Sequence, residues 1–115
     1  GLVKSGEVWR LGANEATEIE LFRSVRIGGK KIKAGRYTLY ALVNESNWTL
    51  ILNKETDTWG SFKYDIKKDV ARAEVTMQKT DSPVENLSMY FEKTALGCNL
   101  NIAWENTRVA LPIVF

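Results

Sequence analysis

The sequence predicts an all-β protein: a single antiparallel β-sandwich of about seven or eight strands with jelly-roll or immunoglobulin-like topology. Three observations support this. Apolar and polar residues alternate from Thr17 to the end of the chain, which is the periodicity of strands. Turn-forming residues separate the alternating segments, and no amphipathic helix pattern interrupts them. At 115 residues, 44% of them hydrophobic, the chain has the size and apolar content of one domain, residues 1–115.

The first half of the alternating region predicts strands on either side of tight turns. Residues 19–27 alternate apolar and polar side chains, and Gly28-Gly29 supplies the positive φ angles that a two-residue hairpin turn requires. The segment 36–43 is apolar on both faces, so we expect a strand in the middle of a sheet. A turn over 44–47 then returns the chain as an antiparallel partner over 48–53.

The second half predicts a short aromatic segment over 59–64 and further strands joined by polar turns. We expect a loop over 79–83 and a two-residue turn at Asn106-Thr107. The expected strands, each with alternating apolar residues, are 71–78, 87–91, 98–104 and 109–115.

The charge balance argues against nucleic acid as a partner. Sixteen basic and fourteen acidic residues leave a net charge of +2, whereas nucleic-acid-binding proteins usually carry a basic stripe. The one local surplus is Lys30, Lys31, Lys33 and Arg36, which we interpret as charges that protect an exposed strand edge from pairing with another chain. No apolar run approaches the ~20 residues of a membrane-spanning helix, so we expect a protein that does not span a membrane.

The residue inventory excludes several chemistries. The chain has no histidine and a single cysteine, Cys98, so catalytic triads in their common forms and zinc sites built on His or Cys ligands are not expected. No glycine-rich phosphate-binding loop occurs. The sequence therefore predicts neither a cofactor nor a metal ion. Cys98 alternates with apolar residues, as expected of a small side chain that packs against the core.

Polar side chains with specific hydrogen-bonding geometry concentrate in the segment from Trp9 to Thr17. Arg10 offers a planar donor fork suited to a carboxylate, Asn14 both donates and accepts, and Glu15 accepts. An aromatic wall from Trp59 or Tyr64 beside these groups would suit a sugar or another small polar ligand. The candidate ligand-binding residues are Arg10, Asn14, Glu15, Thr17, Trp59, Tyr64, Asp69 and Arg72.

The same residues also have a purely structural interpretation. Polar side chains beside tight turns usually satisfy backbone groups or one another. Arg10 would then pair with Glu15 or Asp69, and Asn14 would cap a turn. Asp69 and Arg72, three residues apart between a turn and a strand, would form a local salt bridge.

The chain resembles an uncharacterised bacterial domain-of-unknown-function family whose signature reads Trp-Arg-x-Gly-Ala-Asn-Glu-x-Thr. That stretch is 9–17 in this sequence, where Leu11 occupies the position of a small hydroxyl residue. Lys33 stands where the family commonly has a proline. The resemblance implies a periplasmic or secreted protein with a first strand ahead of Gly1, and it implies no activity. Further matches are Ala34-Gly35, Tyr37, Trp48, Ile51, Asn53, Trp59-Gly60, Tyr64, Asp69, Arg72, Glu85, Trp104-Glu105 and Pro112-Ile113.

Three functions follow as hypotheses. The leading one is a non-catalytic exported module that binds a small polar or carbohydrate-like ligand. The second is a structural or protein-interaction domain without a pocket. The third is a hydrolase that uses Glu15 with a second carboxylate, which requires two acids about 5–9.5 Å apart around a cleft. The sequence does not predict an oligomeric state.

Overall fold

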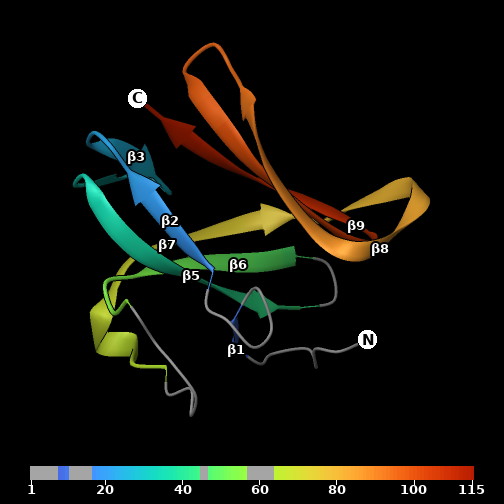
Figure 1. Ribbon diagram of the computed structural model, residues 1–115, viewed down its shortest axis with the longest axis horizontal. Helices are drawn as coiled ribbons and strands as arrows, with labels where there is room; N and C mark the ends of the chain where they lie inside the picture. Colours follow the sequence, from blue (N-terminus) through green and yellow to red (C-terminus); the bar gives the residue numbers. More distant parts are fainter. Residues whose placement is uncertain (1–7, 11–16, 45–46, 57–63) are drawn as a thin grey trace.

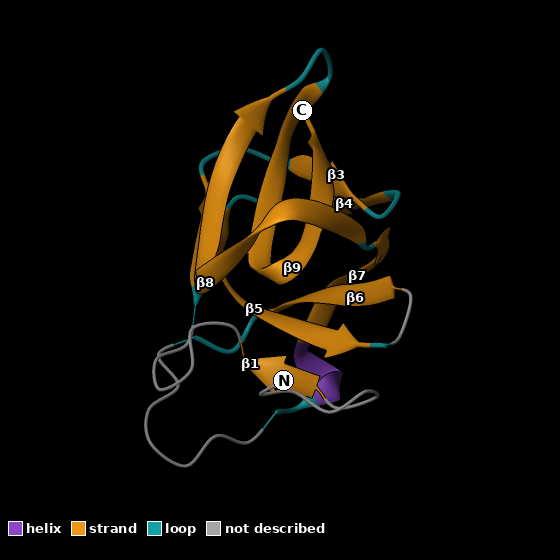
Figure 2. Ribbon diagram, turned by 90° about the vertical axis from the view of Figure 1, so that its right-hand side faces the viewer, coloured by secondary structure: helices purple, strands orange, loops and turns teal. Residues whose placement is uncertain are grey.

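The computed structural model describes the backbone of residues 8–10, 17–44, 47–56 and 64–115, and the side chains of the last three ranges except 82–86. All the strand pairs within these ranges are antiparallel, and they form two packed sheets, so the predicted all-β sandwich is confirmed (Figures 1 and 2). The first sheet contains β1 (Val8–Arg10), β2 (Glu18–Leu21), β5 (Gly35–Val43), β6 (Asn47–Asn53) and β7 (Asp69–Thr76). The second sheet contains β3 (Val25–Ile27), β4 (Lys30–Ile32), β8 (Gln78–Lys93) and β9 (Gly97–Val114). A short 3₁₀ turn, η1 (Ile66–Lys68), precedes β7.

Strand β5 lies in the middle of the first sheet, as its two apolar faces predicted. On one side it pairs with β6 along six residue pairs, from Thr38 opposite Asn53 to Val43 opposite Trp48. On its other side β1 and β2 follow one another along the same edge, with β1 opposite 40–42 and β2 opposite 35–38. Strand β7 pairs with β6 and forms the other edge of this sheet.

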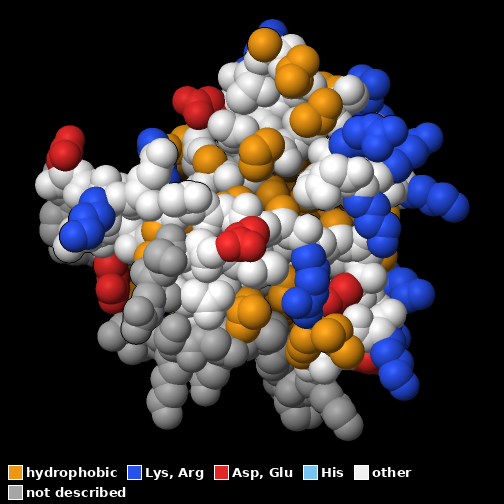
Figure 3. All heavy atoms as spheres, turned by 180° about the vertical axis from the view of Figure 1, so that it is seen from behind, with side chains coloured by type: hydrophobic (Ala, Val, Ile, Leu, Met, Phe, Trp, Pro, Cys, Tyr) orange, Lys and Arg blue, Asp and Glu red, His pale blue; other side chains and the backbone are white. Residues whose placement is uncertain are grey.

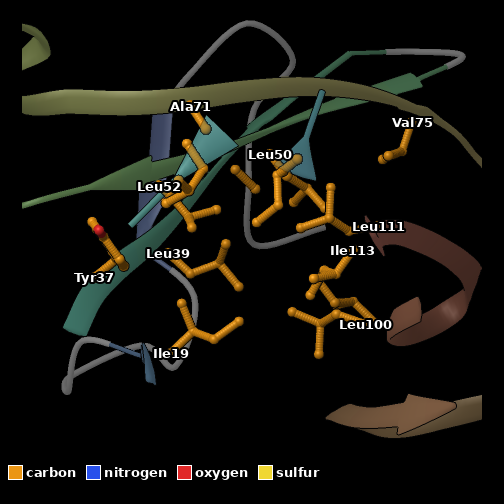
Figure 4. Close-up of a cluster of buried hydrophobic side chains, with 14 of the residues drawn as sticks. Ile19, Tyr37, Leu39, Leu50, Leu52, Ala71, Val75, Leu100, Leu111 and Ile113 are labelled. Carbon is orange, nitrogen blue, oxygen red and sulfur yellow. The ribbon is translucent and has the colours of Figure 1, made fainter. Parts of the chain in front are cut away.

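The main core lies between the two sheets. Leu39 and Leu50 from the first sheet face Leu111 and Ile113 from the second, and all four are nearly or fully excluded from solvent (Figure 4). Burying apolar side chains on both inner faces is the principal stabilising term of a sandwich. Cys98 is half-buried and packs against this cluster, as its alternation with apolar residues predicted.

The hairpin of β3 and β4 turns at Gly28-Gly29, as predicted. Both glycines have positive φ, +60° and +77°, which non-glycine residues adopt only with strain. A Cβ atom at Gly28 would lie 2.6 Å from the carbonyl oxygen of Arg72. The tip of this hairpin therefore packs against the backbone of edge strand β7 and brings the two sheets together there.

Strand β9 bends back on itself next to the turn predicted at Asn106-Thr107. Eighteen extended residues would measure about 59 Å, but the longest dimension of the molecule is 39 Å. Glu105 has a positive φ of 54°, and beyond it the chain returns, so that Phe115 N donates to Leu96 O at 2.9 Å (Figure 1). Gly97 lies so close to the Ile113 carbonyl that a Cβ there would overlap it.

Two expected connections therefore differ in the structure. Asn106-Thr107 belongs to β9, and the reversal falls at Glu105 instead. The expected loop over 79–83 lies inside β8, where the register with β9 shifts twice. Within the described ranges no helix is long and apolar enough to cross a membrane.

Candidate functional site

The outer face of the first sheet carries side chains that are buried although they point away from the main core. Thr38, Tyr40, Ile51 and Asn53 occupy alternate positions of β5 and β6, and each is at most 1% exposed. Two of them are polar, and buried polar groups are costly unless hydrogen-bonded. The chain between β6 and β7 provides the partners for both.

This connection is held to the sheet through its backbone. The Thr38 hydroxyl donates to the Glu55 carbonyl oxygen at 2.5 Å. Asn53 Nδ2 donates to the Asp65 carbonyl oxygen at 2.9 Å, and its Oδ1 accepts from Glu55 N at 2.9 Å. An ion pair between Lys68 and Glu55 joins the two ends of the connection at the surface. The buried side chains of Thr38 and Asn53 thus hold the backbone at Glu55 and Asp65, and the candidate site is built beside these residues.

Three of the predicted site residues, Tyr64, Asp69 and Arg72, come together here with Asn53, and we call these four residues the Asp69 cluster. Asn53 Nδ2 donates to Asp69 Oδ1 at 2.9 Å. The Tyr64 hydroxyl donates to Asp69 Oδ2, which also accepts from Arg72 Nε at 3.1 Å. Arg72 Nη2 donates in turn to the Tyr64 oxygen at 2.9 Å. The local salt bridge expected between Asp69 and Arg72 is present, but it is one part of a larger network.

The environment of Tyr64 keeps its hydroxyl protonated. Partial burial, followed by the hydrogen bond to Asp69, raises the pKa of Tyr64 to about 12. Its ring meets the buried Tyr40 ring edge-on, with centroids 5.1 Å apart and an interplanar angle of 67°. The phenol is therefore a fixed donor to Asp69 at neutral pH, and it is not suited to act as a base.

Arg72 connects this cluster to a groove. Its side chain is 40% exposed, and its Nε and Nη2 atoms are engaged by Asp69 and Tyr64. Of the described residues, none accepts a hydrogen bond from Nη1. The groove has a volume of about 480 Å³ and runs along the edge of β7, between the β3–β4 turn and the end of β9. The charged residues that line it are Arg26, Arg72 and Glu74.

The remaining walls of the groove are mostly apolar. Ala73 and Val75 line it from β7, and Pro112 and Val114 line it from β9. The backbone of Gly28-Gly29 closes one side without a side chain, so a bound molecule could approach the main chain there. Small-molecule sites typically have volumes of about 300–1,000 Å³ and combine apolar walls with a few polar groups, and this groove has both properties.

The model of one protein family matches residues 1–113, nearly the whole chain. The chain belongs to the DUF2911 family. The family is described as a protein of unknown function, which agrees with the uncharacterised family that the sequence resembles. No curated protein and no solved structure matches the DUF2911 chain.

The other predicted site residues of the DUF2911 chain are not brought into the Asp69 cluster by any described contact. Arg10 is the last residue of β1 and lies opposite Tyr40 in the register, and its side chain is outside the described residues. Thr17 is half-buried ahead of β2, where its carbonyl oxygen accepts from Leu39 N at 2.9 Å. Asn14, Glu15 and Trp59 lie outside the described residues.

Sequence reasoning did not select three residues that the structure brings to the site. Asn53 is a polar residue directly after the apolar run 50–52, and that signal could have identified it. Arg26 and Glu74 look like ordinary solvent-facing strand residues, and only the packing of the β3–β4 turn on β7 brings them to one groove. In the part of the chain that the structure describes, no three His, Cys, Asp or Glu side chains gather as a metal site requires.

Proposed function

We propose that this DUF2911 protein is a non-catalytic, exported binding module for a small carbohydrate-like ligand that carries a carboxylate. The observation that supports this is the presence of two arginines, Arg26 and Arg72, from different sheets in one groove of about 480 Å³. Arginine presents a planar fork that matches a carboxylate, and paired N–H donors make this recognition specific.

Arg72 is oriented before any ligand arrives. Asp69 and Tyr64 hold its Nε and Nη2 atoms, so binding would immobilise little additional side-chain freedom. The hydrogen bonds to Tyr64 and Asp69 raise the pKa of Arg72, which keeps the guanidinium charged. In this proposal the Asp69 cluster positions the arginine, and the groove receives the ligand.

The other walls suit a sugar ring. The apolar side chains of Val75, Pro112 and Val114 can cover the C–H face of a pyranose. Glu74, which also accepts a hydrogen bond from Asn47, can accept from ring hydroxyls. A uronic acid combines these features in one molecule.

Titration of ¹⁵N-labelled protein with glucuronate, followed by amide chemical shifts, tests this proposal. We expect shifts at Gly28, Gly29 and Ala73 and weaker shifts with glucose. Arg72→Gln should weaken binding about tenfold or more, because it removes a charge-assisted donor pair. Arg36→Gln is the matched control, since Arg36 pairs with Glu18 outside the groove. Equal shifts in Arg26→Gln/Arg72→Gln and in the wild type would rule out this groove.

The second hypothesis, a structural domain without a pocket, is favoured by one observation. Asn53, Tyr64 and Asp69 are engaged with one another, and the donors of the cluster that they leave for a ligand are the remaining N–H groups of Arg72. This hypothesis predicts no amide shifts with any sugar. A third outcome would reassign the binding site. If Arg10→Ala/Glu15→Ala abolishes binding and Arg72→Gln does not, the ligand binds at the segment 9–17 and not in the groove. The hydrolase hypothesis depends on Glu15 and gains no support from the described residues.

Export to the periplasm or the medium belongs to the same proposal and is supported by the family resemblance of the segment 9–17. Cell fractionation of the full-length protein in its own host is the test. Recovery in the cytoplasmic fraction alone would contradict it.

A further inference from the structure

One face of the molecule, around the β3–β4 hairpin, combines positive charge with exposed apolar side chains. Residues 21–44 contain no acidic residue. They contain Arg23, Arg26, Lys30, Lys31, Lys33 and Arg36. The first five are exposed, lie on or beside the β3–β4 hairpin and form what we call the basic face. Figure 3 shows Lys and Arg side chains gathered along the right-hand flank of the molecule.

These charges are not neutralised by neighbours. None of the five residues of the basic face forms an ion pair with a described residue. Asp69 borders a hollow that Lys30, Lys31 and Lys33 also line. Its carboxylate, however, already accepts hydrogen bonds from Asn53, Tyr64 and Arg72. The lysines therefore present their full charge to the surroundings.

Three large apolar side chains protrude beside this charge. Phe22, Leu96 and Phe115 are 86%, 71% and 59% exposed. The Arg23 guanidinium lies 5.4 Å from the centre of the Phe115 ring, and Phe115 N donates to Leu96 O. A shallow hollow of about 260 Å³ is lined by Phe115 together with Arg26 and Lys31. The apolar and basic side chains therefore form one continuous surface.

We propose that this surface docks peripherally on a lipid bilayer with anionic headgroups. Basic side chains near such a surface are attracted to it electrostatically, by about fivefold in affinity for each charge. Protruding apolar side chains gain further free energy by entering the boundary between headgroups and acyl chains. Nucleic acid is the less fitting partner, because stacking of successive bases needs several aromatic rings along one groove, and of these three side chains only Phe115 lines one of the hollows described above.

Co-sedimentation with vesicles tests the proposal, using phosphatidylcholine alone and phosphatidylcholine mixed with phosphatidylglycerol. We expect binding only to the anionic vesicles, and weaker binding at high salt. Lys30→Glu/Lys31→Glu should reduce the partition coefficient about 30-fold or more. The matched control is Lys54→Glu/Lys67→Glu, which changes the net charge equally at exposed lysines outside the basic face and should reduce binding much less.

A second pair of variants separates lipid from a soluble polyanion. Phe22→Ser/Leu96→Ser should weaken vesicle binding and leave retention on a heparin column unchanged. Retention on heparin without binding to anionic vesicles would reassign the basic face to a soluble polyanion and overturn the proposal. Equal vesicle binding by the two lysine variants would overturn it as well. Arg72→Gln should leave vesicle binding intact. A result that disproves ligand binding in the groove therefore does not also disprove membrane docking by the basic face.

Discussion

Replacing Asp69 with alanine tests whether the Asp69 cluster is a structural element of the fold. The Asp69 carboxylate accepts hydrogen bonds from Asn53, Tyr64 and Arg72, and these residues come from β6, the connection and β7. Asp69→Ala removes the one group on which the three donors converge. If the network holds the connection onto the sheet, the free energy of unfolding must fall substantially.

The magnitude follows from the exposure of each donor. Asn53 is 1% exposed, so one of its buried N–H groups would lose its partner at a cost of about 1–3 kcal/mol. The half-buried Tyr64 hydroxyl can turn to water, and its loss is about 1 kcal/mol. The Arg72 pair is 40% exposed on the arginine side and contributes about 0–1 kcal/mol. We therefore expect a loss of about 3 kcal/mol, out of about 5–15 kcal/mol for a domain of this kind.

Urea unfolding followed by tryptophan fluorescence measures this loss, with Arg72→Gln as the comparison. Arg72→Gln removes the exposed pair with Asp69 and the hydrogen bond to the Tyr64 oxygen, and it should cost about 1 kcal/mol. A double-mutant cycle between Asp69→Ala and Tyr64→Phe should give a coupling energy of about 1 kcal/mol. A loss below about 1 kcal/mol for Asp69→Ala, with no coupling to Tyr64, would refute the argument that buried donors depend on this carboxylate.

Three further predictions concern other parts of the fold. Gly28→Ala should destabilise the fold by about 2–4 kcal/mol, because a positive φ strains alanine and its Cβ would meet the Arg72 carbonyl oxygen. Gly29→Ala has no neighbour within 4 Å and should cost only the strain of the positive φ, about 1 kcal/mol. Equal losses would contradict the packing of the turn on β7. Because the folded pKa of Tyr64 is raised to about 12, its contribution is complete below pH 10 and is lost as the pH rises from 10 to 12. Water screens this partly exposed side chain, so unfolding at pH 9 and pH 11 should show that Tyr64→Phe loses about 0.5–1 kcal/mol less over this interval than the wild type. Identical pH dependences would argue against it. Burial raises the pKa of the Cys98 thiol, so less of it is in the reactive thiolate form. An aromatic disulfide reagent at pH 8 should therefore label the folded protein at least about tenfold more slowly than the urea-unfolded chain. Equal rates would indicate an accessible thiol.

Much of the fold could be predicted because its signals are local. The positive-φ turn at Gly28-Gly29 and the pairing of 36–43 with 48–53 follow from glycine chemistry and from alternation, which depend only on neighbours in the chain. The reversal of β9 at Glu105 is not local in this sense. Asn106-Thr107 predicts a turn next to this point, but it does not predict that Glu105 takes the positive φ or that Gly97 lies against Ile113, sixteen residues away.

The residues of the candidate site also fall into two groups, those that local sequence signals could predict and those that they could not. Tyr64, Asp69 and Arg72 are close in sequence, and their association could be expected from spacing and from residue type. Asn53 and Arg26 reach the site through strand register and through the contact between the sheets, which spacing does not encode. Arg10, Asn14, Glu15 and Trp59 stay predictions.

By itself, the sequence determined the fold class, the central strand and the first hairpin, because periodicity and turn chemistry act through short-range physical rules. Only the tertiary structure decided which polar side chains are buried, which arginines share a groove, and that Lys31 of the β3–β4 hairpin lines one hollow with Phe115. The physical reason is that strands far apart in the chain pack against one another. This packing determines which side chains are buried and which charges lie near each other, and the energy of a charge depends on those neighbours.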